Sequence, residues 1–296
     1  MNMMSSSAVD GERGKRTSLL FLAPALLTLI VFLLVPAGIV LRISFFPGNT
    51  TIGAEGYSFA QYIKFFGNPL YLSVLWETVS YALIVCLGCL ALGFPVGYSL
   101  ARHPPAKRRL LMLMVIVPLT LSLVIVVFGW LVLLGRQGLI NNILLELGVV
   151  SSPQQLLFNR TAVVVVLIQQ FLPFMILSVM NVVMQIDPVL EQASTSLRAN
   201  RARTFIKVII PLSTPGIMAG LSLIFVMAVS AFVTPRLVGG PRAQMIGGFV
   251  YDQILTTSNW PFGAAMAFVL FAVGFGLMAA LNATIIRPLT RGLHAR

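Results

Sequence analysis

Four cations lie within ten residues of one another in a chain of which only 9% of the residues are charged. They belong to the segment 191–216, EQASTSLRANRARTFIKVIIPLSTPG, and are Arg198, Arg201, Arg203 and Lys207. A cluster of this kind suits an acidic protein partner, an anionic membrane surface or nucleic acid. The helices and loops that carry the cluster determine what the four side chains face, so they are needed to choose among these three partners.

The rest of the chain offers few residues for catalysis or metal binding. Cys86 and Cys89 stand as Cys-Leu-Gly-Cys inside an apolar run, and neither His103 nor His294 completes a set of metal ligands. We therefore predict that both cysteines are small residues in helix packing and that the chain holds no metal. The phosphate-binding pattern G-x-x-x-x-G-K-[ST] does not occur in the sequence, so ATP hydrolysis is expected on another subunit.

The composition predicts an all-α integral membrane protein. Hydrophobic residues make up 58% of the 296 residues, whereas soluble domains are about 45–50% apolar and about 25% charged. A helix that crosses a bilayer needs about 20 mainly apolar residues. Six stretches qualify as spans, roughly 17–43, 76–101, 110–134, 161–185, 214–234 and 261–286. The first is too long for a signal peptide and lacks a convincing cleavage site, so we expect it to be retained.

The distribution of cations predicts the orientation of these spans, because cytoplasmic loops carry an excess of Lys and Arg. With the N-terminus in the cytoplasm, that side receives 14 of the 20 Lys and Arg residues: Arg13, Lys15, Arg16, Arg102, Lys107, Arg108, Arg109, Arg198, Arg201, Arg203, Lys207, Arg287, Arg291 and Arg296. The others lie near or beyond the outer ends, at Arg42, Lys64, Arg136, Arg160, Arg236 and Arg242. We expect cytoplasmic tails at 1–16 and 287–296 around a membrane domain at 17–286. The net charge of +12 is then a topology signal and argues against nucleic acid as a partner.

The cationic segment itself is typical of two short helices in a loop between the fourth and fifth spans. Asp187 and Pro188 favour the start of a helix, and we expect that helix to run to about Leu197. Asn200 is a good cap for a second short helix over 201–208. Both helices would be ordered and would lie near the membrane surface.

The end of this loop, which we place at 187–212, is marked by proline. We expect Pro211 to end the second short helix and Ser213 or Thr214 to cap the fifth span. The pattern alone leaves two roles open. The loop either rests on anionic lipid headgroups or fits as a rigid knob into a groove on a cytoplasmic partner.

The segment resembles the EAA loop of type I ABC importer permeases, whose pattern reads roughly E-[EA]-A-A-x-x-L-G-A-x-x-x-x-x-F-x-x-[IV]-x-L-P-x-x-x-P-G. It matches at Glu191, Ala193, Leu197, Ala199, Phe205, Val208, Pro211, Pro215 and Gly216. It departs at Ser194, where Ala is usual, and at Arg198, where the family has a Gly that suits a turn with positive φ. The resemblance implies docking on an ATPase through Glu191, Gln192, Ala193, Leu197, Arg198, Ala199, Phe205, Pro211 and Gly216.

The C-terminal third is similar to the spermidine/putrescine branch of these permeases. The likeness is clearest at Gly239–Gly240, at Asp252–Gln253 and at the stretch NWPFGAA, residues 259–265. It implies a multi-pass permease of the bacterial inner membrane that pairs with a second permease subunit, either a paralogue or a copy of itself. Two ATPase subunits and a periplasmic binding protein complete the assembly. ATP and Mg would bind to the ATPase, so this chain would carry no cofactor and would not be an enzyme.

A polyamine is the transported solute that this branch implies. Ferric iron, an aminophosphonate or an opine is an alternative solute, because permeases of this branch resemble importers of these compounds. A membrane scaffold without transport is the alternative from another class, but a scaffold has no need of the pattern between Glu191 and Gly216.

Six residues are candidates for lining a path for a polycation, which should prefer carboxylates, aromatic faces and carbonyl oxygens. Glu77 is an acid at the outer edge of the second span, where charge is costly. Gln169 and Gln170 lie in the middle of the fourth span, and the remaining candidates are Trp130, Tyr251 and Asp252. Hydrogen bonding between helices, packing and anchoring at the membrane interface are the alternative roles, and the pattern favours them.

Overall fold

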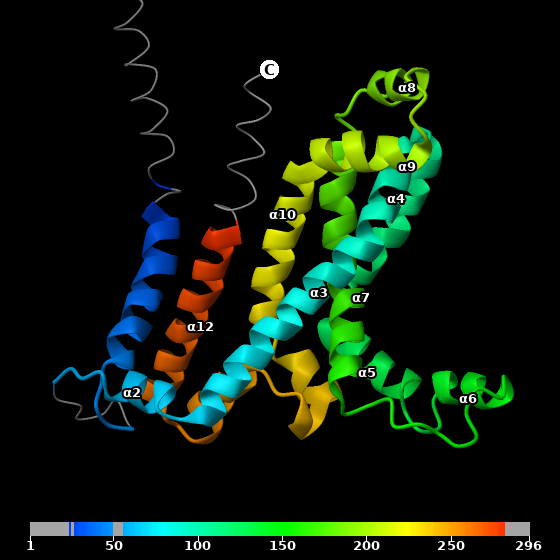
Figure 1. The fold of residues 1–296 in the computed structure, drawn as a ribbon. Helices are drawn as coiled ribbons and strands as arrows, with labels where there is room; N and C mark the ends of the chain where they lie inside the picture. The colour runs from blue at the N-terminus through cyan, green and yellow to red at the C-terminus, as the bar shows by residue number, and fades with distance from the viewer. Residues whose placement is uncertain (1–23, 25–26, 50–55, 282–296) are drawn as a thin grey trace, which may run out of the picture.

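The computed structural model describes residues 24, 27–49 and 56–281, and the regular structure in these ranges is entirely helical (Figure 1). Five helices in the described ranges are long and apolar enough to cross a membrane. They are Leu27–Ser44, α3 (Pro69–Arg102), α7 (Arg160–Val183), the continuous helix Arg201–Val229 and α12 (Trp260–Leu281). The prediction of an all-α multi-pass membrane protein is thereby confirmed. The predicted tails and the beginning of the first span lie outside the described residues.

Helix α7 lies at the centre of the bundle, between α3 and α10 (Ile210–Val229). Small residues allow the close approach of these helices. A Cβ atom added to Gly97 of α3 would lie 2.8 Å from the carbonyl oxygen of Ile176, and one added to Gly216 of α10 would lie 2.8 Å from that of Ser178. These glycines therefore set the distance of α3 and α10 from α7.

The main hydrophobic core fills the space between these three helices. Its fully buried members include Val85, Val163, Leu167, Met175 and Ile224. Cys86 and Cys89 are free thiols that are buried in the same cluster. This location confirms that the two cysteines serve helix packing.

The third predicted span, 110–134, is broken rather than continuous. Helices α4 (Pro105–Thr120) and α5 (Leu123–Leu133) meet at an angle of 94°, and they make a sixth span only if the pair is counted as one. The backbones of Leu121 and Ser122 are both extended, with ψ of 144° and 134°. Two extended residues turn the chain sharply, whereas the run of apolar side chains continues through the turn.

The fifth predicted span begins much earlier than expected, and Pro211 does not end a helix. Helix α9 (Arg201–Thr204), the π-helix η1 (Phe205–Ile209) and α10 form one continuous helix. In η1 the amide of Ile210 donates to the carbonyl of Phe205, one residue further back than in an α-helix. The wider turn accommodates the proline ring, which clashes with the carbonyl four residues earlier in a regular α-helix. Ser213 and Thr214 therefore lie inside the helix and do not cap it.

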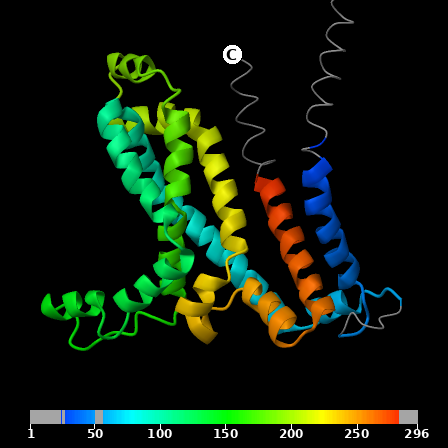
Figure 2. The same ribbon diagram turned by 180° about the vertical axis from the view of Figure 1, so that it is seen from behind.

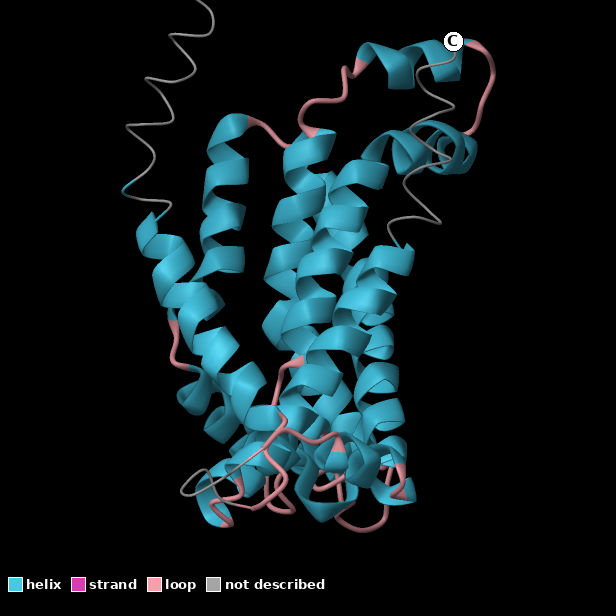
Figure 3. Ribbon diagram, turned by 90° about the vertical axis from the view of Figure 1, so that its left-hand side faces the viewer, coloured by secondary structure: helices cyan, strands magenta, loops and turns pink. Residues whose placement is uncertain are grey.

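The short elements gather at the two ends of the bundle (Figures 1 and 3). The lower end in Figure 1 holds α2 (Ala60–Phe66), α6 (Leu139–Glu146), η2 (Pro235–Gly239), η3 (Gly240–Arg242), α11 (Ile246–Tyr251) and η4 (Asp252–Thr256). The upper end holds α8 (Val189–Ser196), α9 and the start of α4. The helix Leu27–Ser44 and α12 lie on the same side of the bundle, away from α6 (Figures 1 and 2), but they stand apart from one another in the view turned by 90° (Figure 3).

Candidate functional site

The loop that follows α7 is built as the sequence predicts at its two helix starts. A carboxylate oxygen of Asp187 accepts a hydrogen bond from the amide of Val189, at 2.9 Å, at the beginning of α8. The side chain of Asn200 accepts one from the amide of Arg203, at 2.8 Å, and so caps α9. Both caps satisfy amides that have no partner within their own helix. The loop is therefore ordered at both helices and stands at the upper end of the bundle (Figure 1).

Arg198 takes the turn between α8 and α9 with a φ of +59°. This is the left-handed region, which glycine adopts readily and other residues adopt at a cost. The turn geometry that the glycine of the family pattern indicates is thus kept in this chain, with arginine in the glycine position. The neighbouring Leu197 is 84% exposed, so the turn presents an apolar side chain to its surroundings.

Arg198→Gly should make the turn more stable locally, by about 0.5–1 kcal/mol, because the left-handed strain exceeds the extra freedom of glycine in the unfolded chain. Amide hydrogen exchange at residues 195–199 should slow by about two- to fivefold. Arg203→Gly is the matched control, because Arg203 lies in a helix where glycine costs about 1 kcal/mol. Faster exchange in both variants would contradict a strained Arg198.

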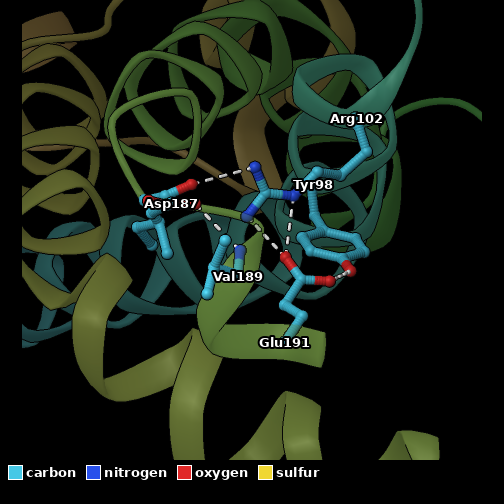
Figure 4. A network of polar contacts seen from close by, with 6 residues as sticks. Tyr98, Arg102, Asp187, Val189 and Glu191 are labelled. Carbon is cyan, nitrogen blue, oxygen red and sulfur yellow. Dashed lines mark hydrogen bonds and ion pairs between the residues drawn. The ribbon is translucent and has the colours of Figure 1, made fainter. Parts of the chain in front are cut away.

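The side chain of Glu191 contacts residues of the same chain, Tyr98 and Arg102, near the upper end of α3 (Figure 4). Its carboxylate receives a hydrogen bond from Nε of Arg102 at 2.8 Å and another from the hydroxyl of Tyr98 at 2.8 Å. Nη1 of Arg102 also donates to the carbonyl of Ile186 at 3.1 Å. The cation that meets Glu191 in this structure is therefore Arg102 of the same chain.

Sequence reasoning missed Tyr98 and Arg102 as members of this site. Arg102 was assigned only as a topology signal, and it lies 89 residues before Glu191 in the chain. The spacing of four between Tyr98 and Arg102 places both on one face of α3. A tyrosine and an arginine on one face at a helix end could have indicated a polar site. Nothing in the sequence, however, connects these two residues to Glu191.

The other residues of the family pattern divide into contacts within the chain and exposed positions. Phe205 packs edge-on against Phe94 and Tyr98, with ring centroids 5.3 Å apart in both pairs. Gly216 packs against α7, and Pro211 is half-buried inside the continuous helix. Gln192, Ala193, Leu197 and Arg198 are exposed, while Ala199 is half-buried.

A cavity of about 370 Å³ with polar and apolar lining residues lies between α8 and the bundle. It is lined by Tyr98, Glu191, Thr195, Arg201, Thr204, Phe205 and Ile209. A hydrogen bond of 2.9 Å between the hydroxyls of Ser194 and Thr204 crosses between α8 and α9 beside it. The helix α8 thus rests on a few polar contacts rather than on a packed apolar face, and none of its residues is fully buried.

Three of the predicted path residues come together beside the bend between α4 and α5. Nε1 of Trp130 donates to the side-chain oxygen of Gln169 at 3.0 Å, and the hydroxyl of Thr234 donates to that of Gln170 at 3.2 Å. Both glutamines line a cavity of about 190 Å³ with Pro118, Leu119, Leu121, Leu123, Val126, Phe171, Phe174 and Met227. The glutamines therefore join helices by hydrogen bonds and also border open space.

Glu77 lies apart from these residues and forms an ion pair with Arg160 at the beginning of α7. The two oppositely charged side chains join α3 to α7, and the carboxylate already has a cationic partner.

Tyr251 and Asp252 form a second polar group at the lower end of the bundle. Nη1 of Arg236 lies 2.6 Å from a carboxylate oxygen of Asp252, and its guanidinium lies 4.9 Å from the ring centre of Tyr251. Asp252 lines a cavity of about 190 Å³ with Phe232, Pro235, Arg236, Gly240, Pro241, Gln244, Met245 and Gly248. The carboxylate is 41% exposed, so it borders both the cavity and the surroundings.

The family described as binding-protein-dependent transport system inner membrane component matches residues 93–291, which include α7, α8 and the continuous helix after it. The chain belongs to this family. The predicted resemblance to importer permeases is thereby confirmed, and so is the expectation of a transport component rather than an enzyme. Within the described residues, no three His, Cys, Asp or Glu side chains are grouped so that they could hold a metal ion.

Two relatives and one solved structure of another protein agree with the assignment to this family. The spermidine/putrescine transport system permease protein PotB of Haemophilus influenzae is 35% identical over 257 residues, which cover 86% of this chain and 87% of that protein. PotB of Escherichia coli K12 is 38% identical over 211 residues, or 71% of this chain and 76% of that protein. A bacterial alginate ABC transporter, crystallised with its alginate-bound periplasmic protein, has a TM-score of 0.75 at 18% identity, over 94% of this chain and 97% of that one. The last likeness concerns the fold alone.

Proposed function

We propose that this chain is the permease subunit of an ABC importer of spermidine or putrescine in the bacterial inner membrane. The observation that carries the proposal is the identity of 35% with a PotB permease along 86% of the chain. The residues that resemble the spermidine/putrescine branch, above all NWPFGAA at 259–265, give the same substrate class. The polyamine would be delivered by a periplasmic binding protein.

The assembly that we propose contains this chain, a second permease subunit, two ATPase subunits and the binding protein. The second permease is a paralogue or a copy of this chain. ATP and Mg bind to the ATPase subunits, and this chain binds no cofactor of its own. The EAA-like pattern of the loop after α7 supports an ATPase partner, and the lipid bilayer surrounds the apolar outer faces of the helices.

The loop 187–212 is the proposed contact with the ATPase. Its large exposed apolar side chains are Val189, Leu190, Leu197 and Ile206, which suit a groove on a protein partner. Glu191 and Phe205 contact α3 and so hold the loop, while Gln192, Ala193 and Arg198 face outwards. The family pattern implies a coupling role for the whole segment. We propose that some of its residues hold the loop on α3 and that others contact the ATPase.

The orientation that we propose puts this loop and both termini in the cytoplasm. In support, α8, α9 and the start of α4 with its three cations gather at one end of the bundle, whereas Arg136, Arg160 and Arg236 belong to segments at the other (Figure 1). This distribution is expected if the end with more cations lies in the cytoplasm, because cytoplasmic loops carry an excess of Lys and Arg.

Single added cysteines should report this orientation, because Cys86 and Cys89 are buried and serve as a silent background. A cysteine at the exposed Ser151 should react with an impermeant maleimide in intact spheroplasts, and one at the exposed Ala202 only after permeabilisation. The parent chain without an added cysteine is the control. Labelling of position 202 from outside would contradict the orientation.

The path for the polycation is proposed to pass the two polar groups described above. Asp252, Tyr251 and the cavity beside them lie at the outer end in this orientation, where an ammonium group would meet a carboxylate and an aromatic ring. Gln169 and Gln170, with Trp130, offer side-chain oxygens deeper in the bundle. Glu77 contributes less, because Arg160 already neutralises it.

Proteoliposomes that hold the complete transporter should take up radiolabelled spermidine or putrescine in an ATP-dependent manner. Asp252→Asn should raise the KM for uptake by about two- to fivefold, the range of an exposed ion pair, with little change in the maximal rate. Uptake of ferric iron, an aminophosphonate or an opine instead would contradict the substrate. Absence of any solute-stimulated ATP hydrolysis would favour a scaffold.

Arg236→Gln is the matched control for Asp252, because it removes the partner of the carboxylate and leaves the carboxylate in place. We expect it to leave the KM unchanged or to lower it. The same rise in KM in both variants would mean that the ion pair serves only the local structure.

A further inference from the structure

Arg102 is the residue at which three elements of the bundle meet. It is the last residue of α3, it donates to the carboxylate of Glu191 in the first turn of α8, and it donates to the carbonyl of Ile186 just after α7. The side chains of Arg102 and Glu191 are 21% and 23% exposed, so the ion pair is largely shielded from solvent. A guanidinium suits this position, because its planar group donates in several fixed directions at once.

Few other contacts hold α8 in place. The hydroxyls of Ser194 and Thr204 form one hydrogen bond, and the cavity beneath α8 leaves room for the helix to tilt. Tyr98 adds a bond to the second oxygen of Glu191 while its ring packs against Phe205. The orientation of α8 therefore depends on Glu191 and on the two residues of α3 that bind it.

Helix α3 connects this point with the opposite end of the bundle. It runs for 34 residues, about 51 Å at 1.5 Å per residue. At the opposite end Glu77 pairs with Arg160, and the hydroxyl of Thr78 accepts a hydrogen bond from the amide of Ile246 at 2.9 Å. One continuous helix, with Pro95 between the two contacts, thus joins α8 to the segment that carries α11 and Asp252.

We propose that Arg102, assisted by Tyr98, is a positioning residue that transmits movement of the ATPase-docked loop to α3 and through α3 to the outer end of the permease. This inference rests on the proposed function of the loop 187–212. Arg102 contacts neither substrate nor nucleotide in this role. It fixes the angle of α8 relative to α3. A displacement of α8 therefore moves the ends of α3 and α7 together, whereas without Arg102 α8 could tilt into the cavity and leave α3 in place.

The test compares Arg102→Gln with Arg102→Lys in proteoliposomes that hold the complete transporter, with spermidine as the probe. We expect Arg102→Gln to retain the ATPase on purification but to lower the number of spermidine molecules transported per ATP by about fivefold or more. Arg102→Lys, which keeps the charge and one donor group, should recover much of that ratio. Arg109→Gln removes an exposed cation of α4, outside the loop 187–212, and should leave the ratio unchanged.

A spin label at Ser196, at the end of α8, gives a second measurement on the permease itself. Its mobility should rise in Arg102→Gln and return towards normal in Arg102→Lys. The double variant Arg102→Gln with Glu191→Gln should be no worse than either single variant, because both remove the same link. An unchanged ratio and unchanged mobility in Arg102→Gln would overturn the proposal. If the unaltered chain itself failed to retain the ATPase, the proposed function would be at fault instead.

Discussion

Glu191→Lys should uncouple ATP hydrolysis from transport almost completely, with a loss of at least about tenfold in transport per ATP. The change places an ammonium group against Arg102 in a partly shielded position and removes the acceptor for Tyr98. Leaving these groups without a partner costs about 1–3 kcal/mol locally. All membrane spans should still insert, because the new charge lies outside the hydrocarbon. The measurement is solute-stimulated ATP hydrolysis and uptake in lipid bilayers, together with recovery of the ATPase on purification.

Two further variants separate charge from size at this position. Glu191→Gln keeps the shape of the side chain and should show an intermediate loss. Adding Arg102→Glu to Glu191→Lys restores attraction between the two positions and should recover part of the coupling. Full coupling with Glu191→Lys alone would show that α8 is held in place by other contacts, or that the loop rests on lipid.

Gly97→Leu should strongly destabilise the packing of α3 against α7. A Cβ atom at this position would lie 2.8 Å from the carbonyl oxygen of Ile176 and 3.0 Å from the Cβ of Val179, and neither group can move away without moving α7. Inserting larger groups into a packed core costs about 1–3 kcal/mol, and more where backbone must shift. We expect a sharply lower thermal stability of the purified chain and a low yield of folded protein.

Gly129→Leu is the control for that prediction. It lies in α5, and a Cβ atom at this position would meet no atom within 4 Å. The thermal stability of this variant should stay close to that of the parent chain. Equal losses at the two positions would mean that the close approach of α3 to α7 is not what requires glycine at position 97.

Features that depend on neighbouring residues in the chain were predictable from the sequence. Long apolar runs gave the spans of α7 and α12, and the caps at Asp187 and Asn200 follow from side chains that reach amides two or three residues away. The turn at Arg198 was indicated by the glycine that the family pattern has there. Each of these features is local, so tertiary contacts did not change it.

Features set by distant contacts or by backbone direction were not predictable. The bend at Leu121 and Ser122 falls in a long, mainly apolar stretch, where hydropathy does not indicate the direction of the backbone. Pro211 continues a helix because a π-turn precedes it. The pairing of Glu77 with Arg160 joins residues 83 positions apart, and the sequence does not indicate which of several cations the acid meets.

The break between α4 and α5 has an electrostatic consequence. The last carbonyl groups of a helix have no partner within it, and they carry the negative end of its dipole, about half an elementary charge. The end of α4 lies at the cavity that Pro118, Leu119 and Leu121 line together with Gln169 and Gln170. The first turn of α5, with Leu123 and Val126, lines the same cavity and carries the opposite, positive end of a helix dipole. A solute at this cavity would therefore meet carbonyl groups from one helix and amide groups from the next, so the main chain offers it both acceptors and donors although no charged side chain lines the cavity.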